Sequence, residues 1–246
     1  MLTIGHITDL HLDGTESSRR RLILVIDAFL SHARRVDALV ITGDVVEVGD
    51  AEDPQAEYEF ARAQTERLGV PTLWCAGNSD GADPEGFGGA ITLPGLTILA
   101  LDSHVPGSFA GAFDDEQLVA AREALAGHRN NDSSVLLALH HPPVALGHET
   151  VDGIRLLDAD PLAALVTEQP SVVGILAGHT HAACSSTFAG VPLVLAQGVH
   201  SNGQLPLDIR EPWSDLIDET AEPAYAVHLV IEGRLVSYFR TVPPPD

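Results

Sequence analysis

Lysine is absent from this chain of 246 residues, and all 13 of its basic residues are arginine. The 35 acidic residues outnumber them, so the formal net charge is −22 at pH 7. Proteins that bind nucleic acid neutralise phosphate groups with lysine and arginine, and anionic membranes attract the same side chains. The composition therefore predicts that neither nucleic acid nor a membrane is a partner. A small anionic ligand remains compatible with it, because bound metal ions would dominate the local potential.

Cysteine is also scarce, and long apolar runs are missing. Cys75 and Cys184 are far apart and lack CxxC spacing, so neither a disulfide framework nor a structural zinc site is expected. No apolar run approaches the roughly 20 residues of a membrane-spanning helix. The first residues enter a strand-like pattern without the basic region or cleavage site of a signal peptide. We therefore expect a soluble, cytoplasmic protein.

No linker-like stretch, internal repeat or block of charge divides the chain. Its length and its hydrophobic content of 45% suit one large domain. We place this domain at residues 1–242 and a proline-rich tail at 243–246. Residues 200–223 form a long, acidic and irregular stretch, and loops of this length are usually functional or disordered.

Strand-like and helical patterns alternate through the first three quarters of the chain. Strands are expected at 2–8, 38–42, 70–76, 91–101 (interrupted by a Pro-Gly turn), 135–139 and 172–177, and helices at 17–36, 55–68, 114–126 and 160–167. Two hairpins are expected afterwards, over 185–196 and 225–241. This order predicts an α/β protein in which two sheets pack together with helices outside.

Seven side chains that can bind metal ions lie where predicted strands end. They are Asp9, His11, Asp44, Asn78, His140, His179 and His181. In open α/β sheets, ligands collect at the carboxyl ends of the strands, so the fold can bring these distant motifs together. Carboxylate, amide and imidazole groups suit zinc, manganese or iron, and the number of ligands suits two ions.

The residues at the strand ends also lead to expectations about backbone conformation. Gly43, Gly77 and Gly178 each precede a candidate ligand, and we expect each to supply the permissive backbone of a sharp exit from a strand. His179 and His181 are two residues apart, so on extended backbone their imidazoles would point the same way.

The ordered set D-x-H, GD, GN, H and GHxH, over residues 9–181, resembles the calcineurin-like metallophosphoesterases. The stretch 101–107, with Gly111, Gln117 and Leu118 beyond it, resembles the class III cyclic nucleotide phosphodiesterase branch. The resemblance implies a four-layer α/β/β/α sandwich of two mixed sheets flanked by helices. It also implies a centre of two metal ions, which would be iron, manganese or zinc.

By the same resemblance, each ion has its own set of ligands. One ion would take Asp9, His11, Asp44 and His181, and the other would take Asp44 as a bridge with Asn78, His140 and His179. His140 is preferred to His141 because the family ligand usually lies two residues before the proline. His141 would then stand behind the ligands or in the pocket wall.

The implied activity is hydrolysis of small phosphodiesters by a hydroxide that bridges the two ions, with 3′,5′-cyclic nucleotides the favoured substrates. Asp44, Asn78, Asp80 and His141 are the expected catalytic residues. A phosphomonoesterase, or a scaffold-like member of low activity, is the alternative. The resemblance also implies that the stretch 200–223 is a cap or pocket-edge segment, with a solvated surface insertion as the alternative interpretation. Because the corresponding region of related enzymes can form a dimer contact, a homodimer is an open expectation.

Ser79 departs from the family pattern. The third motif usually reads GNH followed by an acidic residue, and its histidine assists the leaving group, whereas here Ser79 precedes Asp80. A serine hydroxyl is too weakly acidic to replace general acid catalysis, which typically contributes about 10²–10⁴-fold. Ser79, His104 and His200 are predicted to border the substrate pocket. His104, His141 and His200 are the candidate substitutes for the missing histidine.

Overall fold

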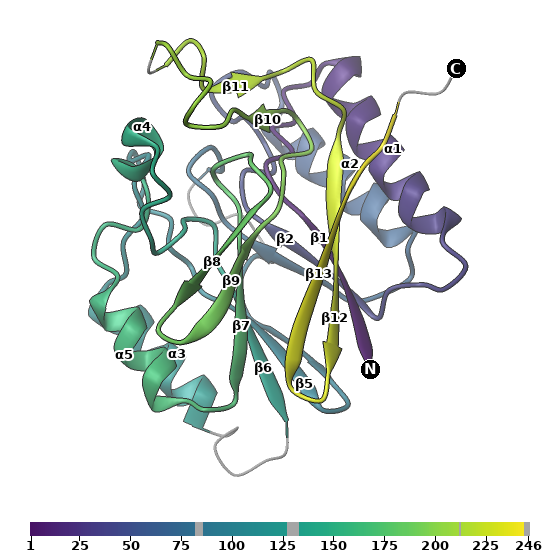
Figure 1. Ribbon diagram of the computed structural model, residues 1–246. Helices are drawn as coiled ribbons and strands as arrows, with labels where there is room; N and C mark the ends of the chain where they lie inside the picture. The colour runs from purple at the N-terminus through teal and green to yellow at the C-terminus, as the bar shows by residue number, and fades with distance from the viewer. Residues whose placement is uncertain (82–85, 127–132, 212, 244–246) are drawn as a thin grey trace.

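The computed structural model describes residues 1–81, 86–126, 133–211 and 213–243 (Figure 1). Its strands are β1 (Leu2–Ile7), β2 (Ala38–Thr42), β3 (Thr72–Cys75), β4 (Ala90–Leu93), β5 (Leu96–Ala100), β6 (Ser134–Ala138), β7 (Val172–Ala177), β8 (Cys184–Phe188), β9 (Val191–Leu195), β10 (Asn202–Gly203), β11 (Ile217–Asp218), β12 (Ala224–Ile231) and β13 (Arg234–Thr241). Its helices are α1 (Glu16–Ser31), α2 (Pro54–Glu66), α3 (Asp115–Ala126), α4 (Glu149–Asp152) and α5 (Asp160–Glu168).

Two mixed sheets form the centre of the molecule. The first has the order β13-β12-β1-β2-β3, in which β1, β2 and β3 are parallel and the other two strands are antiparallel. The second has the order β4-β5-β6-β7-β9-β8, with parallel strands in its middle and an antiparallel strand at each edge. Helices α1 and α2 cover the first sheet, and α3 and α5 cover the second (Figure 1). The predicted four-layer α/β/β/α sandwich is confirmed.

Successive side chains of the central strands alternate between two apolar layers, which explains why these strands appear in the sequence as continuous apolar runs. In β2, Leu39 and Ile41 pack against the helices, whereas Ala38 and Val40 pack between the sheets. Strand β6 divides its side chains between the outer and inner layers in the same way. Successive side chains of a strand point to opposite faces, and a parallel sheet covered on both sides must be apolar on both. The central strands therefore bind the four layers together.

Several element boundaries differ from the sequence prediction. Helix α1 ends at Ser31 instead of residue 36, because His32 adopts an extended conformation (φ −65°, ψ 142°) and its N–H bonds to the carbonyl of Phe29. Val36 fits the helical period but is buried from the segment that follows the helix. Strand β3 begins at Thr72 instead of residue 70. The short helix α4 and the ribbon of β10 and β11 were not predicted.

Other expectations concern the termini, the thiols and membrane spans. Residues 244–246 of the predicted tail lie outside the described residues. Cys75 and Cys184 are both free. Among the described residues, no helix combines the length and apolar character that crossing a membrane requires.

A pair of histidines is buried in the first sheet. His6 Nδ1 lies 3.0 Å from His228 Nε2, and the remaining nitrogens bond to Thr42 Oγ1 at 2.8 Å and to Ser237 Oγ at 2.8 Å. Burial, followed by the charge of its partner, holds the pKa of His6 well below its usual range. Burial alone lowers the pKa of His228 to about 3. Both rings are therefore neutral in the folded protein near neutral pH.

This pair should make the protein less stable in mild acid. Below about pH 6.5 the two histidines take up protons only in the unfolded chain, so the free energy of unfolding falls as the pH falls toward the folded-state values. The slope approaches about 1.4 kcal/mol per pH unit for each histidine. Chemical denaturation between pH 7.5 and 4.5 should give a flatter profile for the double variant His6→Leu/His228→Leu than for wild type. The exposed His32→Leu is the control, and parallel profiles for wild type and the double variant would contradict the expectation.

Candidate metal centre

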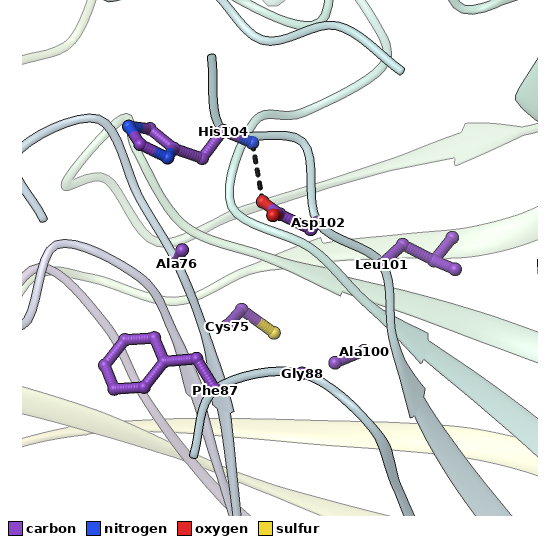
Figure 2. A pocket seen from close by; sticks show the side chains of 8 residues that line it. All are labelled: Cys75, Ala76, Phe87, Gly88, Ala100, Leu101, Asp102 and His104. Atoms are coloured by element: carbon purple, nitrogen blue, oxygen red, sulfur yellow. Dashed lines mark hydrogen bonds between the residues drawn. The ribbon is translucent and has the colours of Figure 1, made fainter. Parts of the chain in front are cut away.

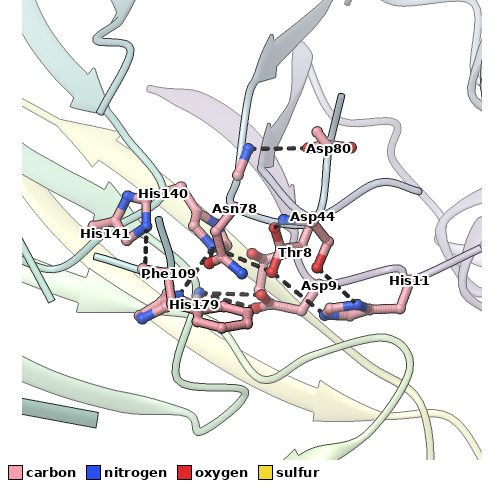
Figure 3. A network of polar contacts seen from close by, with 12 residues as sticks. Thr8, Asp9, His11, Asp44, Asn78, Asp80, Phe109, His140, His141 and His179 are labelled. Carbon is pink, nitrogen blue, oxygen red and sulfur yellow. Dashed lines mark hydrogen bonds and ion pairs between the residues drawn. The ribbon is translucent and has the colours of Figure 1, made fainter. Parts of the chain in front are cut away.

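The seven candidate ligands meet at one end of the sandwich, in the loops that follow five parallel strands. Figure 3 labels all of them except His181. Asp9 and His11 follow β1, Asp44 follows β2, Asn78 follows β3, His140 follows β6, and His179 and His181 follow β7. Strands β1 to β3 belong to the first sheet and β6 and β7 to the second. The cluster therefore spans the two sheets.

Five of these residues have a left-handed backbone conformation. Their φ angles are 51° at Asp9, 41° at His11, 51° at Asp44, 71° at His179 and 53° at His181. Such angles are uncommon outside glycine, cost energy, and gather at functional sites. The expectation that His179 and His181 share an extended backbone was wrong, because both residues have positive φ angles.

Hydrogen bonds between neighbouring loops hold this strained backbone. The N–H groups of Leu10 and His11 donate to the carbonyl of Asp44 at 2.8 and 2.9 Å, and the N–H of Asp9 donates to Gly43 at 3.1 Å. The N–H of His179 donates to both carboxylate oxygens of Asp9 at 3.1 Å. Hydrogen bonds between protein groups thus fix the strand ends to one another.

The glycines before the ligands serve two different purposes. Gly43 has φ +92° and needs the conformational freedom that was predicted. Gly77 and Gly178 do not have positive φ. A Cβ at Gly77 would collide with the carboxylate of Asp44, and one at Gly178 would collide with the hydroxyl of Thr8. At these two positions the requirement is close approach of another chain segment, not an unusual backbone angle.

One set of ligand atoms surrounds the Nε2 atom of His11. This nitrogen lies 3.2 Å from His181 Nε2 and 3.5 Å from Asp44 Oδ2. His181 Nε2 is in turn 3.7 Å from Asp9 Oδ1. Asp9, His11 and His181 can thus direct one atom each at a common point.

A second set surrounds the Nε2 atom of His140. This nitrogen lies 3.2 Å from Asn78 Oδ1, 3.2 Å from His179 Nδ1 and 3.3 Å from Asp44 Oδ2. The same Asp44 oxygen therefore faces both sets. A carboxylate in that place can bridge two cations, which lie roughly 3.5–4 Å apart in two-metal hydrolases.

The hydrogen bonds of the outer ring nitrogens show that the sets fit cations. His11 Nδ1 donates to Glu47 Oε2 at 2.7 Å, and His140 Nδ1 donates to the carbonyl of Thr42 at 2.6 Å. Because both partners are acceptors, each neutral ring keeps its lone pair on Nε2. Those lone pairs face oxygens and nitrogens that also offer lone pairs. A cation satisfies such an arrangement, and the outer hydrogen bonds fix the rings for it.

The electrostatics of the cluster also favour positive charge. Burial lowers the pKa of His11, but the hydrogen bond to Glu47 and the charge of Asp44 outweigh it and raise the value to about 9. Burial also lowers the pKa of His140, but the charge of Asp44 and its hydrogen bond outweigh this effect and raise the value to about 9. Burial would raise the pKa of Asp44, yet the charge of His140 holds it well below its usual range. A metal ion can supply the positive charge that protons otherwise supply.

Asp80 does not reach the candidate centre, although its motif position predicted a catalytic role. One of its oxygens accepts the N–H groups of Val45 and Val46 at 3.0 Å, and the other accepts the N–H of Gly77 at 2.9 Å. The side chain is buried, with 4% exposed. Its carboxylate instead ties the loop after β2 to the loop after β3.

His141 lies behind the candidate ligands. Its Nε2 donates to the carbonyl of Phe109 at 3.2 Å, and its Nδ1 bonds to Ser103 Oγ at 2.9 Å. Burial lowers its pKa well below the usual range. With both nitrogens engaged, the ring packs against the imidazoles of His140 and His179.

The three predicted pocket residues separate into two places. Ser79 and His200 line a cavity of about 480 Å³ above the ligand cluster. His104 lines a separate cavity of about 210 Å³, together with Cys75, Phe87 and Asp102 (Figure 2). The N–H of His104 donates to Asp102 Oδ1 at 2.9 Å. His104 is therefore not among the residues that border the candidate centre.

Glu47, Phe109 and Ser201 were not singled out as site residues in the sequence. Glu47 and Ser201 orient His11 and His181, the latter through a contact of 2.6 Å between Ser201 Oγ and His181 Nδ1. The cavity is also lined by Phe109, Trp213, Leu216, Ile217 and Glu219. The last four belong to the segment 200–223, in which β10 and β11 form a ribbon near the strand ends (Figure 1).

Comparison with known proteins agrees with this architecture. A family model described as calcineurin-like phosphoesterase matches residues 2–183. The chain belongs to this family. The resemblance predicted from the spacing of the ligands is thereby confirmed.

Relatives of the chain carry phosphodiesterase names. A probable cyclic nucleotide phosphodiesterase of Rhodococcus erythropolis is 30% identical over 224 residues, covering 83% of this chain and 73% of the relative. A glycerophosphodiester phosphodiesterase of Enterobacter lignolyticus is 27% identical over 264 residues, covering 96% and 90%. A dimetal phosphatase from Danio rerio shares the fold, with a TM-score of 0.71, 15% identity, and coverage of 98% and 99%. The chain is a metal-dependent phosphoric ester hydrolase of a family that uses a binuclear metal centre.

Removing the hydroxyl of Ser201 should weaken metal binding. Ser201→Ala leaves the His181 ring without its outer hydrogen bond, so we expect roughly 10-fold lower affinity for one ion of the pair. Calorimetric titration of the metal-free protein with Mn²⁺ or Zn²⁺ measures this directly. Ser186→Ala, at an exposed position on β8, is the control. Unchanged affinity for both ions in Ser201→Ala would contradict the expected role.

Proposed function

We propose that the protein is a binuclear metal-dependent phosphodiesterase that hydrolyses small phosphodiesters, with 3′,5′-cyclic nucleotides as the leading substrates. The observation that carries the proposal is the double cluster of ligand atoms around Asp44 Oδ2, at the floor of a cavity of about 480 Å³. The names of the relatives at about 30% identity support the substrate class.

In this proposal the seven ligands divide between two ions. Asp9, His11, Asp44 and His181 hold one, and Asp44, Asn78, His140 and His179 hold the other. When bound, the ions lower the pKa of water to generate a nucleophile and neutralise charge on the phosphate group. Asn78 turns its carbonyl oxygen toward His140, so its amide N–H groups can donate to a phosphate oxygen in the cavity.

The charge of the cavity favours a diester over a monoester. Its lining includes the carboxylates of Asp13, Glu47, Asp50 and Glu219, and no arginine is among the lining residues that the structure describes. A phosphomonoester carries roughly −1.5 to −2 charges at pH 7, whereas a diester carries one. The acidic rim repels the monoester more strongly. We therefore rank the phosphomonoesterase second.

Assistance to the leaving group falls to His200 in this proposal. Of the three histidines considered as substitutes for the missing one, His141 is engaged behind the ligands and His104 faces another cavity. His200 lines the metal cavity, and its ring lies 5.6 Å from that of His11. Its buried Nδ1 has no partner among the described residues.

We also propose that the segment 200–223 acts as a cap. Its side chains of Trp213, Leu216 and Ile217 border the cavity, and Trp213 is 67% exposed there. A large exposed aromatic side chain beside a ligand cavity suits contact with the organic part of a substrate. The cap would then set substrate range while the loops of the sandwich set the reaction.

Substitution of the shared carboxylate provides the main test. Asp44→Asn removes the charge that faces both ligand sets, so we expect hydrolysis of cyclic AMP and bis-p-nitrophenyl phosphate to fall roughly 100-fold or more. Chelation of wild type should abolish activity, and added Mn²⁺, Fe²⁺ or Zn²⁺ should restore it. Asp115→Asn, on the distant helix α3, is the control of equal charge. Activity that survives chelation would overturn the two-metal proposal.

Restoring the family histidine should change the dependence on the leaving group. Ser79 lies in the cavity, its N–H donates to Asp44 Oδ1 at 2.8 Å, and its hydroxyl is 3.4 Å from His11 Nδ1. In Ser79→His, we expect turnover of esters with poor leaving groups to rise, by about 10-fold or more. Activated p-nitrophenyl esters should hardly respond. Steady-state rates on matched pairs of esters decide the point, and equal effects on both classes would contradict it.

A further inference from the structure

A side cavity of about 100 Å³ adjoins the metal cavity. Both are bordered by Val151, Thr180 and Leu216, and Thr180 stands between the candidate ligands His179 and His181. The side cavity lies between the loop at α4 and the segment around β10 and β11. A molecule whose phosphate rests at the candidate metal centre can therefore extend into it.

The walls of the side cavity are mainly apolar. Leu146, Val151, Leu205, Pro206 and Leu216 supply most of the aliphatic surface. Leu205 is 62% exposed. These walls suit a flat or compact apolar group and offer little to a polyol.

One nitrogen of His148 provides a fixed donor in this apolar setting. The N–H of Val151 donates to His148 Nδ1 at 3.3 Å, so the proton of the neutral ring is on Nε2. That Nε2 is buried and has no hydrogen-bond partner among the described residues. The N–H groups of Leu146, Gly147 and His148 all donate to the carboxylate of Asp152, at 2.6, 3.0 and 3.1 Å, which holds the loop in place.

An unpartnered buried donor is costly, and a ligand acceptor removes that cost. The group that suits this cavity has apolar faces and an in-plane acceptor, which describes the ring of a nucleobase. Gln204 also borders the cavity, and its amide can serve as donor and acceptor together. We propose that the side cavity binds the base of a nucleotide and that His148 Nε2 donates to a ring acceptor. This inference rests on the proposed phosphodiesterase function and names the substrate class of that site.

Two substitutions at position 148 separate the donor from the loop structure. Asn can keep the acceptor that caps Val151 N–H but cannot reach the place of Nε2, whereas Gln can place a donor near that point. On the full-length protein loaded with Mn²⁺, calorimetry would measure binding of 5′-AMP and of inorganic phosphate. We expect His148→Asn to weaken binding of 5′-AMP roughly 3- to 10-fold and to leave phosphate binding unchanged. His148→Gln should bind 5′-AMP nearly as wild type does.

Leu207→Ala is the control, because Leu207 is 94% exposed and does not border either cavity. The inference is overturned if His148→Asn binds 5′-AMP as tightly as wild type, or if its affinities for 5′-AMP and phosphate fall equally. A measurement on wild type alone covers the case in which the variants do not fold. Wild type should bind 5′-AMP about 10-fold more tightly than ribose 5-phosphate. Equal affinities for the two compounds would also overturn the inference.

Separate measurements of binding and of turnover distinguish this test from the test of the proposed function. If metal-loaded wild type hydrolyses no phosphodiester yet binds 5′-AMP through His148, the phosphodiesterase proposal fails and the nucleobase site stands. If diesters are hydrolysed without preference for a base, the reverse holds.

Discussion

The carboxylate of Asp44 is the group on which both halves of the candidate centre depend. Its Oδ2 faces His11 of the first sheet and His140 of the second, and its Oδ1 accepts the N–H of Ser79. The backbone carbonyl of the same residue accepts N–H groups from the loop after β1. One buried residue thus joins three loops and two sheets. In that position Asp44 has a left-handed backbone, and Gly77 can lie against its carboxylate only because glycine has no Cβ.

Much of the fold could be predicted because burial leaves a clear pattern in central strands. Strand β2, covered on both faces, appears as an unbroken apolar run, and its bounds of 38–42 were predicted correctly. The end of α1 could not be predicted. Val36 continues the helical period, yet it reaches the core from the segment after the helix, which depends on tertiary packing. Helix α4, only four residues long, leaves almost no periodic signal.

The candidate ligands could be predicted because the carboxyl ends of parallel strands lie at one edge of a sheet. A short motif after each strand is therefore enough to identify its ligand. The direction of a side chain is harder to predict. Asp80 follows the ligand loop in sequence, but three backbone N–H groups turn its carboxylate away from the cavity. Glu47 and Ser201 act through contacts with His11 and His181 over 36 and 20 residues, and no short motif records such pairs.

The strained turns at the ligands have a consequence for metal exchange. Hydrogen bonds between protein groups hold these turns: the N–H groups of Leu10 and His11 donate to the carbonyl of Asp44, and the N–H of His179 donates to the carboxylate of Asp9. A cation that binds there would therefore spend little of its binding energy on ordering the loops, in contrast to a zinc finger, which folds only with its metal. Exchange of one ion for another would then leave the loops in place. Its imidazole, carboxylate and amide groups admit several transition metals, so the supply of metal would govern its occupancy.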